Sequence, residues 1–143
     1  MKKPGSNPLT KVTAAVIERD GKVLIARRRK ETGSGGLWEF PGGRLEDVET
    51  PEKGLEREIA EELGVHIHVG DLLQSVPYRS PALSIELLAY RAVLVSSEFK
   101  LTDHDEIRWA EPSELEESAF SEPDRPIVRL LISKSARAAL QRP

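Results

Sequence analysis

The sequence predicts an α+β protein in which a mixed β-sheet is sandwiched between two helices, an α/β/α arrangement. Runs rich in β-branched residues outnumber the segments with a helical period, and the helical segments fall between and after the strands. A chain of 143 residues with 38% hydrophobic and 31% charged residues has the composition of one globular domain. We therefore expect residues 9–143 to form a single domain, preceded by a flexible tail at residues 1–8.

Composition also limits the classes of function. The chain has no Cys, which excludes a disulfide framework and a thiolate metal site. Its first ten residues, MKKPGSNPLT, lack the apolar stretch of a signal peptide, and no run approaches the ~20 apolar residues of a membrane helix. A net charge of −3 disfavours a nucleic-acid polymer as partner but permits a small nucleotide. We expect a cytoplasmic protein without a membrane partner, present as a monomer or weak dimer.

The first predicted element is a β-hairpin. Two β-rich runs in KVTAAVIERDGKVLIARRR flank Asp20-Gly21, a pair typical of a type I′ turn. The following KETGSGG, residues 30–36, predicts a loop, and LWEFPGG, residues 37–43, predicts a short strand that ends in a turn.

A helix is predicted over residues 51–63. Thr50 suits the N-cap, Pro51 suits the first helical position, and Gly64 suits the stop after the last turn.

The rest of the chain predicts two long strands near residues 72–79 and 83–95. A short strand, EIRWAE, and a helical turn, PSELEE, follow them. A closing amphipathic helix begins around Pro126 in RPIVRLLISKSARAALQR. Its apolar side is predicted to carry Ile127, Leu130, Leu131 and Ala138.

The helix at residues 51–63 concentrates negative charge on one side. At about 100° per residue, Glu58, Glu61 and Glu62 fall within roughly 100° of one another, beside a separate apolar stripe. Like charges at this spacing cost a few tenths of a kcal/mol per pair. Gly54 lies in the same face and, because it has no side chain, is expected to let another group approach the helix closely. Clustered carboxylates suit Mg²⁺ or Mn²⁺, and the alternative is a solvated acidic face.

The same residues carry a family resemblance. Gly43, Glu49 and the run REIAEELGV match the Nudix box, residues 43–65, at every defined position. The chain is identified as similar to the MutT-like nucleoside triphosphate pyrophosphatases, which include the 8-oxo-dGTP diphosphatase and CTP pyrophosphohydrolase types. ERDGKVLIARR, GLWEFPGG, HDEIRW and FSEPDRPIV extend the resemblance outside the box. The resemblance implies the Nudix fold.

The resemblance also implies the chemistry. MutT-like proteins use Mg²⁺, for which Mn²⁺ can substitute, to hydrolyse a normal or oxidised nucleoside triphosphate to the monophosphate and pyrophosphate, a housekeeping role for the nucleotide pool. Three sets of residues follow from the match. The catalytic set is Arg57, Glu58, Glu61 and Glu62. The metal set is the Gly42 carbonyl with Glu58, Glu61, Glu62 and Asp103, for which Asp105 and Glu106 are alternatives. The structural set is Gly43, Glu49 and Gly64, and Arg57 with Glu49 resembles the orienting pair of the family.

Substrate binding is expected from residues outside the box, namely Arg28, Phe40, Arg44, Leu83 and Asp124. Arg28 and Arg44 could instead be surface residues, Phe40 could be core, and Asp124 could cap the last helix. An ionised Asp only accepts hydrogen bonds, which suits a cytosine amino group or a guanine N–H. Ala82 and Leu83, where MutT has charged and aromatic residues, make a pyrimidine or broader substrate range competitive.

Two other functions remain open at this point. One is hydrolysis of another nucleoside diphosphate derivative such as ADP-ribose, and the other is nucleotide sensing without catalysis. His66, His68 and His104 lack ligand-like spacing and are expected to be surface or strand residues.

Overall fold

The computed structural model describes residues 9–31 and 35–141, so the predicted tail and the middle of the predicted loop lie outside the described residues. The strands are β1 Thr10–Arg19, β2 Lys22–Arg28, β3 Trp38–Glu39, β4 Gly42–Arg44, β5 Ile67–Arg79, β6 Ser84–Leu94 and β7 His104–Ala110. The helices are α1 Pro51–Leu63 and α2 Arg125–Gln141, with 3₁₀ turns η1 Pro112–Glu114, η2 Glu117–Ala119 and η3 Glu122–Asp124. The predicted α+β class is confirmed.

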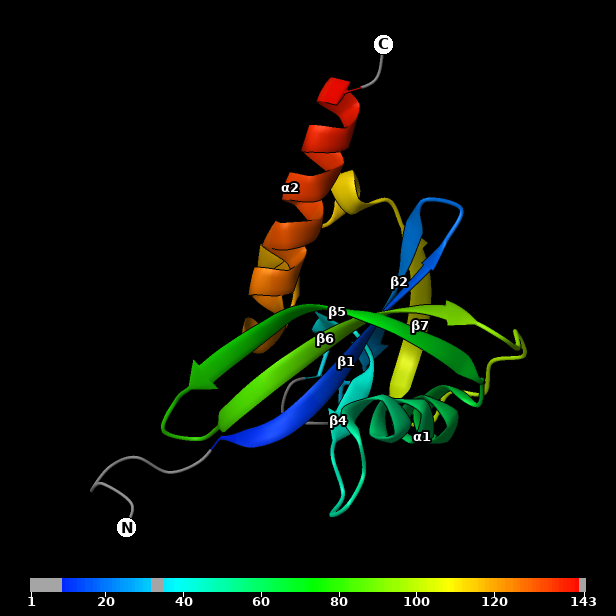
Figure 1. Cartoon of the computed structure of the whole chain (residues 1–143), viewed down its shortest axis with the longest axis vertical. Helices are drawn as coiled ribbons and strands as arrows, with labels where there is room; N and C mark the ends of the chain where they lie inside the picture. The colour runs from blue at the N-terminus through cyan, green and yellow to red at the C-terminus, as the bar shows by residue number, and fades with distance from the viewer. Residues whose placement is uncertain (1–8, 32–34, 142–143) are drawn as a thin grey trace.

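A mixed seven-stranded sheet organises the molecule (Figure 1). Its order is β3-β2-β1-β6-β5, with β4 also paired to β1 and β7 also paired to β2. The β1–β6 pair is parallel, whereas the other pairs are antiparallel. The central strand β1 therefore lies beside β4, which leads into α1, and this places the helix next to the middle of the sheet.

Each face of β1 contributes to a separate core. Ala14 and Val16 belong to the apolar cluster that includes Ile127 of α2. The alternate residues of β1 belong to a second cluster with Leu55 and Ile59 of α1. Because successive side chains of a strand point to opposite faces, the two helices cover opposite sides of the sheet, as predicted.

The local signals in the sequence correctly mark the first hairpin and α1. Asp20 and Gly21 both have positive φ, 53° and 78°, as a type I′ turn requires. The Thr50 side chain accepts a hydrogen bond from the Lys53 N–H at 3.2 Å, and Gly64 ends the helix at φ 69°. The predicted helix over residues 51–63 is therefore confirmed at both ends.

Three predictions of detail are wrong. The strand expected near 72–79 begins at Ile67, because pairing with β6 continues through register shifts between Val69 and Gln74. The PGG segment forms β4 and not only a turn. On α2, Ala138 is exposed, because the C-terminal part of this helix extends past the sheet (Figure 1). The buried residues of α2 are Ile127, Val128 and Leu131, while Leu130 is half-buried.

No helix within the described ranges is long and apolar enough to cross a membrane.

Val48, in the loop between β4 and α1, holds a strained backbone that suggests a stability test. Its φ is 65°, a region that β-branched residues rarely adopt, and its side chain is fully exposed. Val48→Asn relieves the strain without removing buried surface, so we expect the free energy of unfolding to rise by about 1 kcal/mol. Urea denaturation measures this change. Val95→Asn, at another exposed valine outside the positive-φ set, is the control and should give no gain. A lower stability for Val48→Asn would contradict the strain.

Candidate active site

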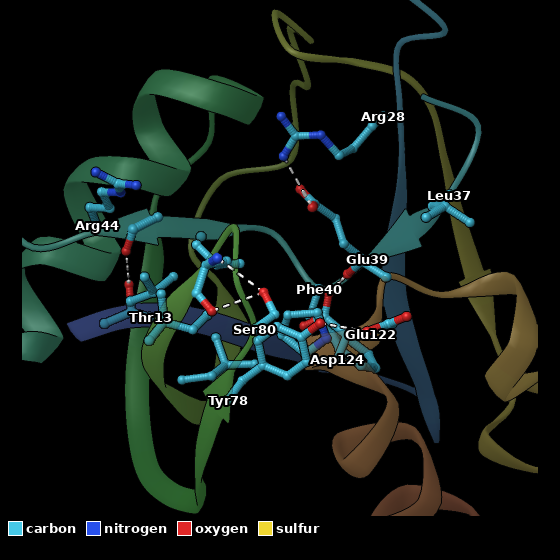
Figure 2. Close-up of a pocket in the computed structure, with 18 of the residues that line it drawn as sticks. Thr13, Arg28, Leu37, Glu39, Phe40, Arg44, Tyr78, Ser80, Glu122 and Asp124 are labelled. Atoms are coloured by element: carbon cyan, nitrogen blue, oxygen red, sulfur yellow. Dashed lines mark hydrogen bonds and ion pairs between the residues drawn. The ribbon is translucent and has the colours of Figure 1, made fainter. Parts of the chain in front are cut away.

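A cavity of about 540 Å³ opens beside β4 (Figure 2). Its wall comes from five separated parts of the chain, namely β1, the end of β2, the segment 37–44 around β3 and β4, the adjoining parts of β5 and β6 with the turn between them, and η3 with the residue before it. All five residues predicted to bind substrate line this cavity: Arg28, Phe40, Arg44, Leu83 and Asp124. In Figure 2 the two arginines lie apart from the place where Tyr78, Glu122 and Asp124 gather. Tyr78, Glu122 and Asp124 therefore mark a carboxyl-lined part of the cavity, and the two arginines lie outside it.

Two glycines let β4 lie close to both β1 and α1. A Cβ on Gly42 would lie 2.0 Å from the carbonyl oxygen of Thr13, and a Cβ on Gly43 would lie 2.5 Å from the carboxylate of Glu58. The Gly42 backbone N–H donates to Glu62, and the Gly43 carbonyl accepts from the Thr13 hydroxyl at 3.1 Å. Both glycines also line the cavity. The helix carboxylates therefore sit directly behind one cavity wall.

Arg57 offsets the repulsion among the acidic groups of α1. Its Nε and Nη2 donate to the two oxygens of Glu49 at 2.7 and 3.0 Å. Its Nη1 lies 3.1 Å from Glu58 and 3.2 Å from Glu61. The hydrogen bonds between Arg57 and Glu49 raise the pKa of Arg57 and lower the pKa of the Glu49 carboxyl, so both groups stay charged. Arg57 and Glu49 are thus in the contact expected of an orienting pair.

Glu58 and Glu62 differ from the solvated carboxylates of the surface. Burial raises the pKa of Glu58, although the charge of Arg57 opposes this shift. Burial, followed by the negative charges of Glu39, Glu58 and Asp103, raises the pKa of Glu62 to about 9. One oxygen of Glu62, Oε2, is buried with no hydrogen-bond partner in the described part of the chain. The carboxyl of Glu62 is therefore surrounded by other acidic groups.

The available donors fit a hard divalent cation. Within residues 9–31 and 35–141, no three Asp, Glu or His side chains already converge closely enough to hold an ion. The unpaired oxygen of Glu62 is nevertheless a group that a cation would satisfy, and carboxylate oxygens are the ligands Mg²⁺ prefers. Glu58 and Glu62 are thus the side chains best placed to bind the ion. Glu61 is 59% exposed and bonded to Arg57.

The structure also separates the three alternatives for a further metal ligand. The charge of Asp103 acts on Glu62. Asp105 instead lies 2.9 Å from Arg27, and Glu106 lies 3.3 Å from the same guanidinium. Asp103 is therefore the acid that remains available on the side of Glu62.

Gly54 makes room for a close approach to the helix, as expected. A Cβ at this position would lie 2.4 Å from the Leu45 side chain and 3.2 Å from a Glu49 oxygen. The glycine therefore makes room for the preceding loop to pack on α1, and not for a ligand.

Asp124 is almost fully buried at the carboxyl-lined part of the cavity. Its carboxyl accepts a hydrogen bond from the Ser121 hydroxyl at 2.6 Å and another from the Phe40 backbone N–H. These bonds tie η3 to the chain after β3, and no bond to the first turn of α2 is found for the described residues. Burial raises the pKa of Asp124 to about 8, so the carboxyl is mostly neutral at pH 7. The condition under which Asp124 would only accept hydrogen bonds, an ionised carboxyl, is therefore mostly not met at pH 7.

Phe40 is a core residue that also lines the cavity. Its ring is buried and stacks on Phe120 with centroids 5.4 Å apart, yet it also lines the cavity. Arg28 and Arg44 line the cavity too, and the alternative of an uninvolved surface arginine is not favoured for either.

Sequence reasoning missed the pair formed by Glu39 and His104. The Nε2 of His104 lies 2.8 Å from one oxygen of Glu39, and the Nη1 of Arg28 lies 3.3 Å from the other. His104 is a strand residue, as expected, but only 1% of it is exposed. No local sequence pattern predicts this contact, because the two residues are 65 positions apart. They meet only because β2 pairs with both β3 and β7.

Comparisons with known proteins agree with this geometry. A family model described as a NUDIX domain matches residues 8–131. The chain is 33% identical over 132 residues to the CTP pyrophosphohydrolase of Escherichia coli K12. This alignment covers 92% of this chain and 98% of that protein. It is 44% identical over 77 residues to the 8-oxo-dGTP diphosphatase of Proteus vulgaris, covering 53% and 69%. The solution structure of the E. coli ORF135 protein matches with a TM-score of 0.78 at 31% identity, covering 99% and 100%.

Proposed function

The chain belongs to the NUDIX family and is a Nudix hydrolase, and we propose that it is an Mg²⁺-dependent nucleoside triphosphate pyrophosphohydrolase. It would release a nucleoside monophosphate and pyrophosphate and so serve nucleotide-pool housekeeping. One observation carries this proposal. The Gly42-Gly43 wall of the 540 Å³ cavity is in contact with Glu58 and Glu62 of α1 on its other side. A nucleoside site and an acidic site thus share one boundary.

The phosphate groups would lie at this boundary. A triphosphate carries about four negative charges, and its transition state spreads charge over the phosphoryl oxygens. Arg28 and Arg44 line the cavity and would contact these oxygens. Glu58 and Glu62, with Asp103 and the Gly42 carbonyl, would hold the divalent cation that members of this family generally use. When bound, such an ion neutralises phosphate charge and lowers the pKa of a bound water.

The other groups of α1 would position the reacting atoms. Arg57 keeps Glu58 and Glu61 in place through contacts of 3.1 and 3.2 Å. Among the carboxylates that contact Arg57, Glu61 is 59% exposed, against 17% for Glu49 and 16% for Glu58. Glu61 would therefore be the one to reach a solvent water and accept its proton. The water oxygen would then form a bond to the α- or β-phosphorus while the P–O bond of the α–β bridge on that phosphorus breaks, so that the products are the monophosphate and pyrophosphate.

The nucleobase would occupy the carboxyl-lined part of the cavity. Phe40, backed by its stack on Phe120, offers an aromatic surface there. Asp124, held by Ser121 and the Phe40 N–H, presents a carboxyl group that at pH 7 can donate as well as accept a hydrogen bond. We therefore propose Asp124 as a reader of the base edge.

A panel of nucleoside triphosphates and nucleoside diphosphate sugars, assayed with Mg²⁺ for pyrophosphate and monophosphate, tests this function. We expect pyrophosphate from at least one triphosphate and much slower cleavage of ADP-ribose. Turnover of ADP-ribose alone would instead support the diphosphate-derivative alternative, and binding without turnover would support a sensor.

We also expect Mg²⁺ to raise the melting temperature, and to raise it more at pH 8.5 than at pH 6. The pKa of Glu62 is about 9 in the folded protein, so at pH 6 a cation must displace its proton. Between about pH 4.5 and 9 the folded state holds a proton that the unfolded state has lost. The metal-free protein therefore loses stability as pH rises through this range, and a cation that binds only the folded site restores it.

Differential scanning fluorimetry with EDTA or millimolar Mg²⁺ measures this effect at both pH values. The variant Glu62→Gln is the control, since it removes the titrating ligand and should reduce both the gain and its pH dependence. Equal melting curves with EDTA and Mg²⁺ at pH 8.5 would argue against the assignment of this site.

A further inference from the structure

Tyr78 and Glu122 meet at the carboxyl-lined part of the cavity, although they come from different elements. Tyr78 lies near the end of β5 and Glu122 begins η3, 44 positions further along the chain. The Tyr78 phenol donates a hydrogen bond to Oε2 of Glu122, and both residues line the cavity beside Asp124 (Figure 2). No role was expected of either residue.

This contact determines which hydrogen-bonding groups the wall can offer. A phenol has one O–H to donate, and in Tyr78 this O–H is hydrogen-bonded to Glu122. The bond raises the pKa of Tyr78, so the phenol stays protonated. The phenolic oxygen and the second carboxylate oxygen of Glu122 are left as acceptors. Ser80 lies beside the phenol, but its hydroxyl donates to the Leu83 carbonyl at 3.1 Å. The neighbouring cation, Arg125, donates its Nε–H to the Phe120 carbonyl at 3.1 Å.

We propose that the Tyr78–Glu122 pair makes the site selective for nucleotides whose base carries an exocyclic amino group, such as cytosine, over those with a carbonyl in its place, such as uracil. This inference rests on the proposed function, because it concerns the base of the same substrate. The amino group of cytosine can donate to the acceptor oxygens of Tyr78 and Glu122. The carbonyl of uracil at that position meets two acceptors, so both partners lose their hydrogen bonds.

The neighbouring position on the same edge of the base completes the pattern. Cytosine presents a ring nitrogen acceptor next to its amino group, whereas uracil presents a ring N–H next to a carbonyl. A neutral Asp124 can donate to the acceptor of cytosine while Glu122 accepts from the amino group. Uracil would require both groups to reverse their roles.

The isosteric pair dCTP and dUTP tests the inference. We expect kcat/KM of the unmodified protein for dCTP to exceed that for dUTP by at least about 10-fold, since the site pairs a hydrogen-bonding group of the base. Glu122→Gln supplies an amide donor that can pair with the uracil carbonyl, so the ratio should fall about 10-fold or more. Tyr78→Phe keeps the ring but removes the hydrogen bond, and the ratio should fall there too. Glu117→Gln, whose carboxylate faces Arg129 outside the cavity, should leave the ratio unchanged.

Each result has a definite reading. A role that is only structural would lower activity on both nucleotides by a common factor. A ratio that is the same in all four proteins therefore overturns the inference, as does an unmodified protein that prefers dUTP. Melting-temperature shifts with dCMP and dUMP give the same comparison without turnover, and they cover a variant that binds but does not react. If the unmodified protein releases pyrophosphate from no triphosphate, the proposed function fails and this inference fails with it.

Discussion

We expect Glu58→Gln to lower kcat on the best nucleoside triphosphate by at least about 10²-fold. The Glu58 carboxylate lies against Gly43 behind the cavity wall, 3.1 Å from Arg57, and its side chain is only 16% exposed. Gln keeps the shape but removes the charge that a divalent cation needs. The apolar side of α1, with Leu55 and Ile59 in the core, is untouched, so the fold should persist.

The measurement is kcat at saturating Mg²⁺, with the melting temperature as a check on folding. Glu56→Gln is the matched control, because Glu56 lies on the same helix but pairs with Lys53 at 3.6 Å on the surface. It should retain nearly full activity. A Glu58→Gln enzyme that keeps more than half of the original rate would remove Glu58 from the catalytic set.

Removing the Asp124 side chain should produce the second large effect. Asp124→Ala is expected to cost about 1–3 kcal/mol in kcat/KM for the best base, or roughly 5- to 150-fold, because a buried hydrogen-bonding partner is lost. A pure helix cap would cost about 1 kcal/mol of stability and scale all substrates equally. The substrates that separate these readings are CTP, dCTP, dGTP and 8-oxo-dGTP.

The raised pKa of Asp124, about 8, adds a pH signature. Below pH 8 the carboxyl is mostly protonated and can donate, whereas above it the carboxylate only accepts. The ranking of the four nucleotides should therefore change between pH 7 and pH 9 in the unmodified protein. Asp124→Asn, which always carries a donor and an acceptor, should keep one ranking at both pH values. A ranking that is constant with pH and identical in both proteins would exclude Asp124 as a reader of the base.

Local signals explain why α1 could be predicted so closely. Thr50, Pro51 and Gly64 each act on the backbone within one turn of their own position, so the helix ends do not depend on the rest of the fold. The carboxylate face follows in the same way from helical spacing. The contact between Arg57 and Glu49 was expected from the match to the Nudix box, and it spans only eight positions.

The rest of the site depends on contacts between distant segments. Glu39 meets His104 only because β2 pairs with both β3 and β7. Gly54 was expected to allow a close approach, but helical spacing cannot show that the side chain that approaches α1 is Leu45. The protonation of Asp124 likewise follows from burial, which no short motif records.

The central claim is that this hydrolase cleaves a nucleoside triphosphate to a monophosphate and pyrophosphate. The most direct test is to incubate the protein with dCTP and Mg²⁺ and to identify the phosphorus products by ³¹P NMR as turnover proceeds. We expect dCMP and pyrophosphate to form in equal amounts, with no turnover when EDTA removes the cation. Formation of dCDP and inorganic phosphate, or a rate unchanged by EDTA, would contradict it.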